Sequence, residues 1–117
     1  MATLAADGRP VTVATWYLWE NGRVLVNMDD ARTRVRYLRQ DPRTTITVLA
    51  EDDWYTHVSL QGRVGAITED VGLQEIDKLS THYTGGPYPD RERPRVAVRL
   101  QVERWHAWGS LREDQPG

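Results

Sequence analysis

The chain has 117 residues and a formal net charge of -2, from 15 Lys and Arg against 17 Asp and Glu. This length corresponds to one domain, which we place at residues 1–110, followed by a short C-terminal tail at 111–117. The acidic balance argues against a general nucleic-acid or membrane binder. The lack of cysteine excludes disulfides and thiolate metal sites and fits a cytoplasmic protein. No apolar run approaches the roughly 18 residues of a membrane span, and the opening residues do not have the pattern of a signal peptide.

The first half of the chain contains two hairpin signals. Asp7-Gly8 and Asn21-Gly22 are dipeptides that favour two-residue turns between antiparallel strands. They predict a strand before the first turn, a second strand over 11–19 and a third over 23–27. The β-branched run TTITVLA predicts a further strand over 44–50.

Two long strands are predicted in the second half. The first covers 54–67, and its internal Gly62 and Gly65 indicate a bulge or a close approach of another backbone. The second covers 95–103 and continues through the string RWHAW. It alternates with period two, which places four apolar side chains on one face: Val96, Val98, Leu100 and Val102.

Two segments interrupt the β pattern with helical spacing. Apolar residues recur at i, i+4 and i+7 from Ala31 within 31–40, and Pro42 ends that helix. A weaker stripe marks 70–83. The Gly/Pro-rich stretch 85–94 that follows reads equally as a mobile flap over a site or as a plain connector. About six strands and two short helices, with the hairpins first, predict a mainly β fold of the small antiparallel barrel type.

A cluster of arginines is the main candidate binding feature. Five fall between residues 31 and 43, against the single acid Asp41: Arg32, Arg34, Arg36, Arg39 and Arg43. If the helix begins at 31, Arg34 lies on the opposite flank from the rest, and the five cannot hold one ligand. If it begins near 34, residues 32–34 and the first free N–H groups converge on one anion. This requires Asp29 or Asp30 to act as the N-cap, because their charge otherwise opposes an anion. The alternative is a solvated basic face.

The histidines and tryptophans give weaker signals. His57, His82 and His106 have no partner at i+3 or i+4, so no metal site is predicted. No nucleophile-elbow string predicts a Ser-His-Asp triad. His57 has a plain alternative as a half-buried polar residue on an open sheet face. The five tryptophans are expected mainly in the core and in a dimer interface, with Trp16 as the candidate wall of a ring-binding cleft.

Five strings, spread over nearly the whole chain, carry a resemblance to a known family. They are ATLAADGRPVTVATWYLWENGRVLVNM, RTRVRYLRQDPRTTITVL, YTHVSLQGRV, THYTGG and VRLQVERWHAWG. Together they resemble the flavin and deazaflavin oxidoreductase superfamily, the pyridoxamine 5'-phosphate oxidase-like split β-barrels, and within it the branch that uses coenzyme F420. RVRYLRQDPR in its strand–helix–strand setting is the most specific piece. Tyr37 departs from the pattern, since Asn is usual at this position.

The resemblance implies a split antiparallel β-barrel of the FMN-binding type that forms a homodimer with the cofactor at the subunit interface. Arg34 falls where the family commonly has a phosphate-binding lysine or arginine, and Arg32 and Thr33 lie in the turn beside it. The other cofactor-binding residues that it implies are Val13, Ala14, Thr15 and Trp16 along the flavin ring, Asn27 and Met28 at the end of the next strand, and His57 in place of a cofactor-contacting glutamine. The outer arginines would serve solubility or the anionic tail of coenzyme F420.

The function that the resemblance implies is that of an F420-dependent oxidoreductase, which transfers a hydride from the reduced deazaflavin to a small organic substrate. No catalytic residue is assigned, because hydride transfer requires no protein nucleophile. Three alternatives stay open: the same barrel with FMN as cofactor, a non-catalytic flavin-binding or storage module, and RNA binding by the arginine helix. The acidic total and the near absence of aromatic residues within 31–43 argue against RNA.

Overall fold

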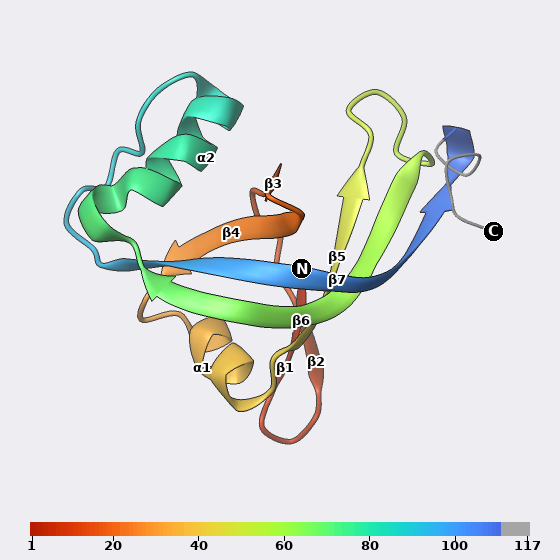
Figure 1. Cartoon of the computed structure of the whole chain (residues 1–117), viewed down its shortest axis with the longest axis horizontal. Coiled ribbons are helices and arrows are strands. Elements are labelled where there is room, and N and C mark those ends of the chain that lie inside the picture. Colours follow the sequence, from red (N-terminus) through yellow and green to blue (C-terminus); the bar gives the residue numbers. More distant parts are fainter. Residues whose placement is uncertain (111–117) are drawn as a thin grey trace.

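The computed structural model describes residues 1–110, and the predicted tail at 111–117 lies outside them. Over the described residues, seven antiparallel strands form one sheet in the order β2-β1-β5-β6-β7-β4-β3 (Figure 1). The strands are β1 (Ala2–Leu4), β2 (Pro10–Thr12), β3 (Leu18–Glu20), β4 (Arg23–Asp29), β5 (Arg43–Leu49), β6 (His57–Glu69) and β7 (Arg95–Trp108). The helices are α1 (Thr33–Gln40), a 3-10 turn (Val71–Leu73) and α2 (Gln74–Thr84). The predicted mainly β, split-barrel fold is confirmed. Within the described residues, no helix is long and apolar enough to cross a bilayer.

The core lies on both faces of β4 and β7. On one face, α1 covers a cluster of buried residues: Val24, Val26, Met28, Val35, Leu38, Ile46, Val96, Val98 and Leu100. On the other face, α2 covers a smaller cluster: Leu25, Ile76, Leu79 and Ala97. The predicted alternation of β7 is confirmed, since its valines and Leu100 point into the first cluster. Both faces of β4 are therefore buried and mainly apolar, which leaves few positions on this strand for polar side chains.

The predicted strand over 11–19 is wrong as one element. The chain leaves the sheet after β2, and residues 13–17 run outside it until β3 begins. Trp16 stacks on the ring of Tyr83 in α2, with the ring centroids 5.2 Å apart and the planes 6° from parallel. The N–H of Tyr17 donates to the hydroxyl of Tyr83 at 3.3 Å. These tertiary contacts outweigh the β propensity of the segment.

β6 begins later than the predicted strand over 54–67. The carboxylate of Asp53 accepts hydrogen bonds from the N–H of Tyr55 (3.1 Å) and the hydroxyl of Thr56 (2.8 Å). This local turn keeps Trp54 and Tyr55 in the loop before the strand, because an Asp side chain offers the backbone an alternative to the ladder.

The two glycines of β6 mark real irregularities, as predicted. The register between β6 and β7 shifts at Gln61/Gly62 and again between Val64 and Ala66, which flank Gly65. A Cβ at Gly62 would collide with the carbonyl oxygen of Gln101. Gly62 is therefore required by the close approach of β7, in line with the expectation from sequence.

α1 begins at Thr33, so the later of the two predicted starts is confirmed. The predicted N-cap role of Asp29 or Asp30 is wrong. The N-cap residue is Arg32, which has extended backbone angles and makes no side-chain cap bond. The Oδ1 atom of Asp29 instead accepts the N–H of Ala31 at 2.8 Å, in the turn before the helix. The first N–H groups of α1 are thus left without a side-chain partner.

The N-terminus of α2 is capped from a distance. Asp70 precedes the 3-10 turn, and its carboxylate accepts the N–H groups of Glu75 and Ile76, both at 2.9 Å. A carboxylate at this end accepts hydrogen bonds from otherwise unpaired N–H groups, and its negative charge interacts favourably with the positive end of the helix dipole. Gly85 ends the helix in the left-handed region, with a φ of 86°.

Candidate cofactor-binding cleft

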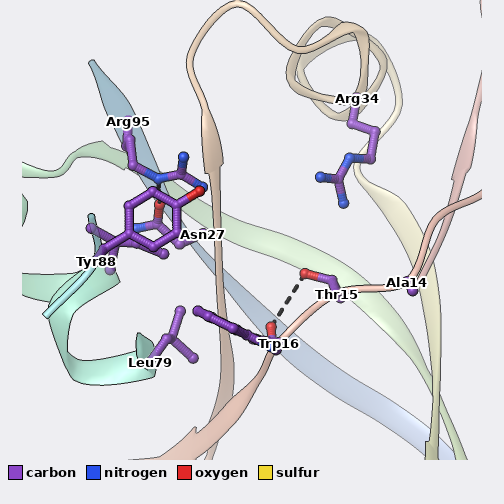
Figure 2. A pocket seen from close by; sticks show the side chains of 9 residues that line it. Ala14, Thr15, Trp16, Asn27, Arg34, Leu79, Tyr88 and Arg95 are labelled. Carbon is purple, nitrogen blue, oxygen red and sulfur yellow. Dashed lines mark hydrogen bonds between the residues drawn. The ribbon is translucent and has the colours of Figure 1, made fainter. Parts of the chain in front are cut away.

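A cleft of about 420 Å³ opens between α1, the segment outside the sheet, α2 and the start of β7 (Figure 2). Nine residues line it: Ala14, Thr15, Trp16, Asn27, Arg34, Ile76, Leu79, Tyr88 and Arg95. In Figure 2, Arg34 enters from α1 on one side, while Arg95 and Tyr88 enter from the other. The cleft thus combines two cations with an aromatic and aliphatic wall.

Arg34 lies in the first turn of α1 and is half-buried. Its buried Nη1 atom has no hydrogen-bond partner among residues 1–110. Burial lowers the pKa of the Arg34 guanidinium from its ordinary value, and the positive charges of Arg32 and Arg95 lower it further. A partly buried cation beside like charges is stabilised by an anion that enters the cleft. Arg34 is therefore the strongest candidate for binding a phosphate.

A second hollow, of about 520 Å³, shares Ala14 and Arg34 with the cleft. Its lining is Val11, Val13, Ala14, Arg32, Thr33, Arg34 and Tyr37. The uncapped start of α1 contributes to this hollow, and helix N-termini favour anions. The nearby acid Asp29 does not dominate here, because its carboxylate lies 3.6 Å from Nη1 of Arg93.

A cluster of three aromatic side chains, Trp16, Tyr83 and Tyr88, borders the cleft on the α2 side. Trp16 lies parallel to Tyr83 and meets Tyr88 edge to face, with centroids 6.3 Å apart and an angle of 88°. The hydroxyl of Thr15 donates to the carbonyl of Trp16 at 3.2 Å (Figure 2). These contacts fix the indole plane, and offset or edge-to-face aromatic pairs are favourable beyond their buried area. The wall offers a flat apolar surface to a planar ligand.

Three polar residues form a chain behind the cleft. Nε of Arg95 donates to Oδ1 of Asn27 at 2.8 Å, and Nδ2 of Asn27 donates to Oδ2 of Asp70 at 2.9 Å. Because an ionised carboxylate only accepts, the amide of Asn27 has one consistent orientation. The guanidinium carbon of Arg95 also lies 4.7 Å from the ring centroid of Tyr88. The Arg95 side chain is therefore held by two groups, the amide of Asn27 on β4 and the ring of Tyr88 in the loop before β7.

The structure brings together most of the cofactor-binding residues that the sequence suggests. Ala14, Thr15, Trp16, Asn27 and Arg34 line the cleft. The remaining predicted residues at the start of α1 and in the segment after β2 line the adjoining hollow, namely Val13, Arg32 and Thr33. Residues 11–34 thus contribute to the lining of both the cleft and the adjoining hollow.

Two of the predicted residues lie elsewhere in the single chain. The side chain of Met28 is 1% exposed and packs in the core under α1, because alternation along β4 turns Asn27 to the cleft and Met28 away from it. His57 lies at the start of β6, where its ring stacks on Trp108 with centroids 4.4 Å apart. Neither residue lines the cleft or the hollow.

Sequence reasoning missed four lining residues: Ile76, Leu79, Tyr88 and Arg95. The first two belong to the predicted apolar stripe of the second helix, which gave a signal for burial but none for a site. Tyr88 comes from the loop at 85–94, whose Gly/Pro-rich composition fits a flap and a plain connector equally. The loop is anchored to α2, since the carboxylate of Asp77 accepts the N–H of Tyr88 (3.0 Å) and pairs with Arg91.

The outer arginines of the cluster differ in their surroundings. Arg43 pairs with Asp41 at 2.7 Å, and its hydrogen bonds lower the pKa of the Asp41 carboxyl to about 2. Arg36 and Arg39 are exposed on α1. No three potential metal-ligating His, Cys, Asp or Glu side chains gather anywhere in residues 1–110. The residues present fit a phosphate and a flat ring, on the strength of the unpartnered Nη1 of Arg34 and the aromatic wall.

Proteins of known structure share the fold of this chain. An F420 reductase of known structure is 25% identical, with a TM-score of 0.78 over 89% of this chain and 84% of that chain. The conserved hypothetical protein Rv2991 from Mycobacterium tuberculosis is 26% identical, with a TM-score of 0.74 over 99% of this chain and 79% of that one.

A heme binding protein from Mycobacterium smegmatis, 24% identical, shares the fold with a TM-score of 0.65 over 92% of this chain and 47% of that one. The sequence profile of the pyridoxamine 5'-phosphate oxidase family matches residues 1–109. This match covers almost the entire chain, so the protein belongs to the pyridoxamine 5'-phosphate oxidase family.

Proposed function

We propose that this chain is an F420-dependent oxidoreductase, which passes a hydride from the reduced deazaflavin to a small organic substrate. The observation that carries the proposal is the buried, unpartnered Nη1 of Arg34 at the head of an aromatic cleft. The likeness to an F420 reductase supports deazaflavin rather than FMN as the cofactor. The family membership supports the broader class of oxidoreductase.

The phosphate of the cofactor is assigned to the start of α1. Arg34 would donate two parallel hydrogen bonds from its planar fork, which suits phosphate oxygens better than a single ammonium. Arg32 and Thr33 line the adjoining hollow, and the uncapped helix end adds N–H groups and a favourable dipole. The exposed Arg36 and Arg39 on the same helix would serve the anionic tail of coenzyme F420.

The ring of the cofactor is assigned to the segment after β2. This segment follows β2, with Val13 and Ala14 in the lining of the hollow and Ala14, Thr15 and Trp16 in the lining of the cleft. When bound, the cofactor supplies the hydride chemistry, and the protein binds, orients and shields it. Trp16 is fixed by its stack on Tyr83, so it can align a flat ring and keep water away from one face.

We infer that the active form is a homodimer. His57 lies outside the cleft of its own chain, and the loop and strand ends around it expose large apolar side chains: Leu49, Trp54 and Tyr55. A second copy that covers this face would bring its His57 toward the cofactor of the first. Light scattering of the purified protein should give the mass of two chains. A mass of one chain, with the cofactor still bound tightly, would refute the dimer.

The test of the cofactor is a pair of titrations on the purified protein. Coenzyme F420 and FMN are added separately, and quenching of tryptophan fluorescence gives the Kd for each. Tight binding of coenzyme F420 with weak binding of FMN is the expected result. Tight binding of FMN would retain the flavin site and replace the deazaflavin chemistry, while binding of neither would refute the proposal. Tight F420 binding without turnover on any acceptor would instead favour a storage module.

A further inference from the structure

Arg95 is a second cation of the cleft, at the opposite end from Arg34. It opens β7, and its Nε donates to Asn27, which is itself bonded to Asp70. Its guanidinium lies over the ring of Tyr88 at 4.7 Å, a distance at which a cation and an aromatic face attract each other. The position and plane of the guanidinium are thus set before any ligand arrives, while its terminal nitrogens stay outside the bond to Asn27.

The charge of Arg95 is not neutralised by an acid. Among residues 1–110, no Asp or Glu oxygen forms an ion pair with it, whereas other arginines have such partners: Arg43, Arg63, Arg91, Arg93 and Arg99. The pKa of the Asp90 carboxyl is lowered mainly by hydrogen bonds from the N–H groups of Glu92 and Arg93. The charge of Arg95 lowers that pKa as well, but it makes a smaller contribution. Arg95 is therefore positioned, lines the cleft and lacks an anion.

The surface next to Arg95 is aromatic and aliphatic. Tyr88 and Trp16 meet edge to face, and Leu79 lies beside the indole in the same cleft (Figure 2). A ligand that reaches Arg95 would lie against Tyr88 and Leu79, beside the Trp16 indole that is assigned to the cofactor ring. An aromatic or conjugated body suits this wall, and a carboxylate suits the paired terminal nitrogens of an arginine fork.

We propose that Arg95 is the residue that selects the substrate, by binding the carboxylate of a planar, conjugated carboxylic acid. The inference rests on the proposed function, because it assigns the Arg34 end of the cleft to the cofactor phosphate and the Arg95 end to the substrate. Arg95 is thus a specificity residue, and the enzyme prefers anionic over neutral planar acceptors.

The test compares two probes of nearly the same shape, one an anion and the other neutral. 2-Naphthoate and 2-naphthamide are titrated by calorimetry into the protein alone and into the protein loaded with coenzyme F420. The wild type should bind the carboxylate at least about tenfold more tightly than the amide, as expected for one charge-assisted hydrogen bond. Arg95→Gln should abolish this preference and should change the Kd for coenzyme F420 far less than replacement of Arg34 does. Arg104→Gln removes an exposed arginine from the same strand, outside the cleft, and should keep the preference.

Three results would overturn the proposal: no preference in the wild type, a preference that survives in Arg95→Gln, or a loss of F420 affinity in Arg95→Gln as large as that caused by changing Arg34. Should Arg95→Gln fail to fold, Arg95→Lys carries the test, since it keeps the charge and loses the fork. Its preference should fall at least threefold, and an unchanged preference would overturn the assignment. If coenzyme F420 does not bind at all but the carboxylate preference depends on Arg95, the proposed cofactor fails and the anion site stands.

Discussion

Replacing Arg34 by methionine should weaken cofactor binding without destabilising the free protein. Methionine keeps an apolar stem and removes the guanidinium. In the structure, the pKa of Arg34 is lowered by burial and by the charges of Arg32 and Arg95, and its buried Nη1 has no partner within residues 1–110. Folding lowers this pKa, so the positive charge of Arg34 costs free energy in the folded state relative to the unfolded chain. The cost is present at every pH below the lowered pKa, including neutral pH. The free protein therefore holds Arg34 at a cost, which a bound phosphate would offset.

The size of the effect follows from the bonds that Arg34 can make. A hydrogen bond to a charged group contributes about 1.5–3 kcal/mol, and the loss of one corresponds to a rise in Kd of about 10- to 150-fold. Tryptophan quenching by coenzyme F420 gives the Kd of the wild type and of Arg34→Met, and thermal unfolding without cofactor gives the stability of each. Arg104→Met is the control, because Arg104 is exposed on β7 away from the cleft.

Either of two results would refute this reasoning. Equal Kd values for the wild type and Arg34→Met would remove the phosphate from this residue. A melting temperature of free Arg34→Met well below that of both the wild type and Arg104→Met would show that the guanidinium stabilises the unliganded fold, contrary to its burial beside two like charges.

Two further predictions concern the scaffold. Gly62→Ala should lower the free energy of unfolding by about 1–3 kcal/mol, because a Cβ there meets the backbone of Gln101. Gly65→Ala should be nearly neutral, because its Cβ would make ordinary contacts, with the Gln101 side chain at 3.5 Å and the Arg99 carbonyl oxygen at 3.8 Å. Urea unfolding of both variants decides between these outcomes. The Asp77 carboxyl has a pKa lowered mainly by its hydrogen bond from Arg91, so its contribution is present at neutral pH and is lost as the pH falls through that lowered value. The difference in melting temperature between the wild type and Asp77→Asn should therefore shrink below pH about 4, and a difference that stays constant down to strongly acidic pH would contradict the assignment.

Local chemistry made much of the fold predictable. Asn21 and Gly22 both adopt positive φ, 54° and 73°, as the dipeptide indicates for a tight hairpin. The buried face of β7 follows from its period-two alternation, and the bulges of β6 follow from its glycines. The strand over 11–19 failed because a side-chain contact decided it. Trp16 leaves the sheet to stack on Tyr83, which is 67 residues away in the sequence and gives no local signal.

The candidate site was predictable only where one residue carries its own signal. Arg34 has such a signal, because an arginine at the start of a helix suggests an anion. Arg95 has none. In the alternating strand, Arg95 and Arg99 look alike, yet Arg99 pairs with Glu20 and Glu75 at 3.6 Å and 3.1 Å, whereas Arg95 has no acid partner in the described part of the chain. These two environments differ through residues distant in the sequence, Glu20 and Glu75 beside Arg99 and Asn27 and Tyr88 beside Arg95.

The acids of this chain explain how a protein of net charge -2 can contain a positive cleft. Asp70 adjoins the site through Asn27, but its carboxylate already accepts three hydrogen bonds, from the side chain of Asn27 and from the N–H groups of Glu75 and Ile76. Its charge stabilises the start of α2 and reaches Arg95 only through the amide of Asn27. The carboxylate therefore fixes the position of Arg95 without forming an ion pair with it, and the positive potential of the cleft remains available to an anionic ligand.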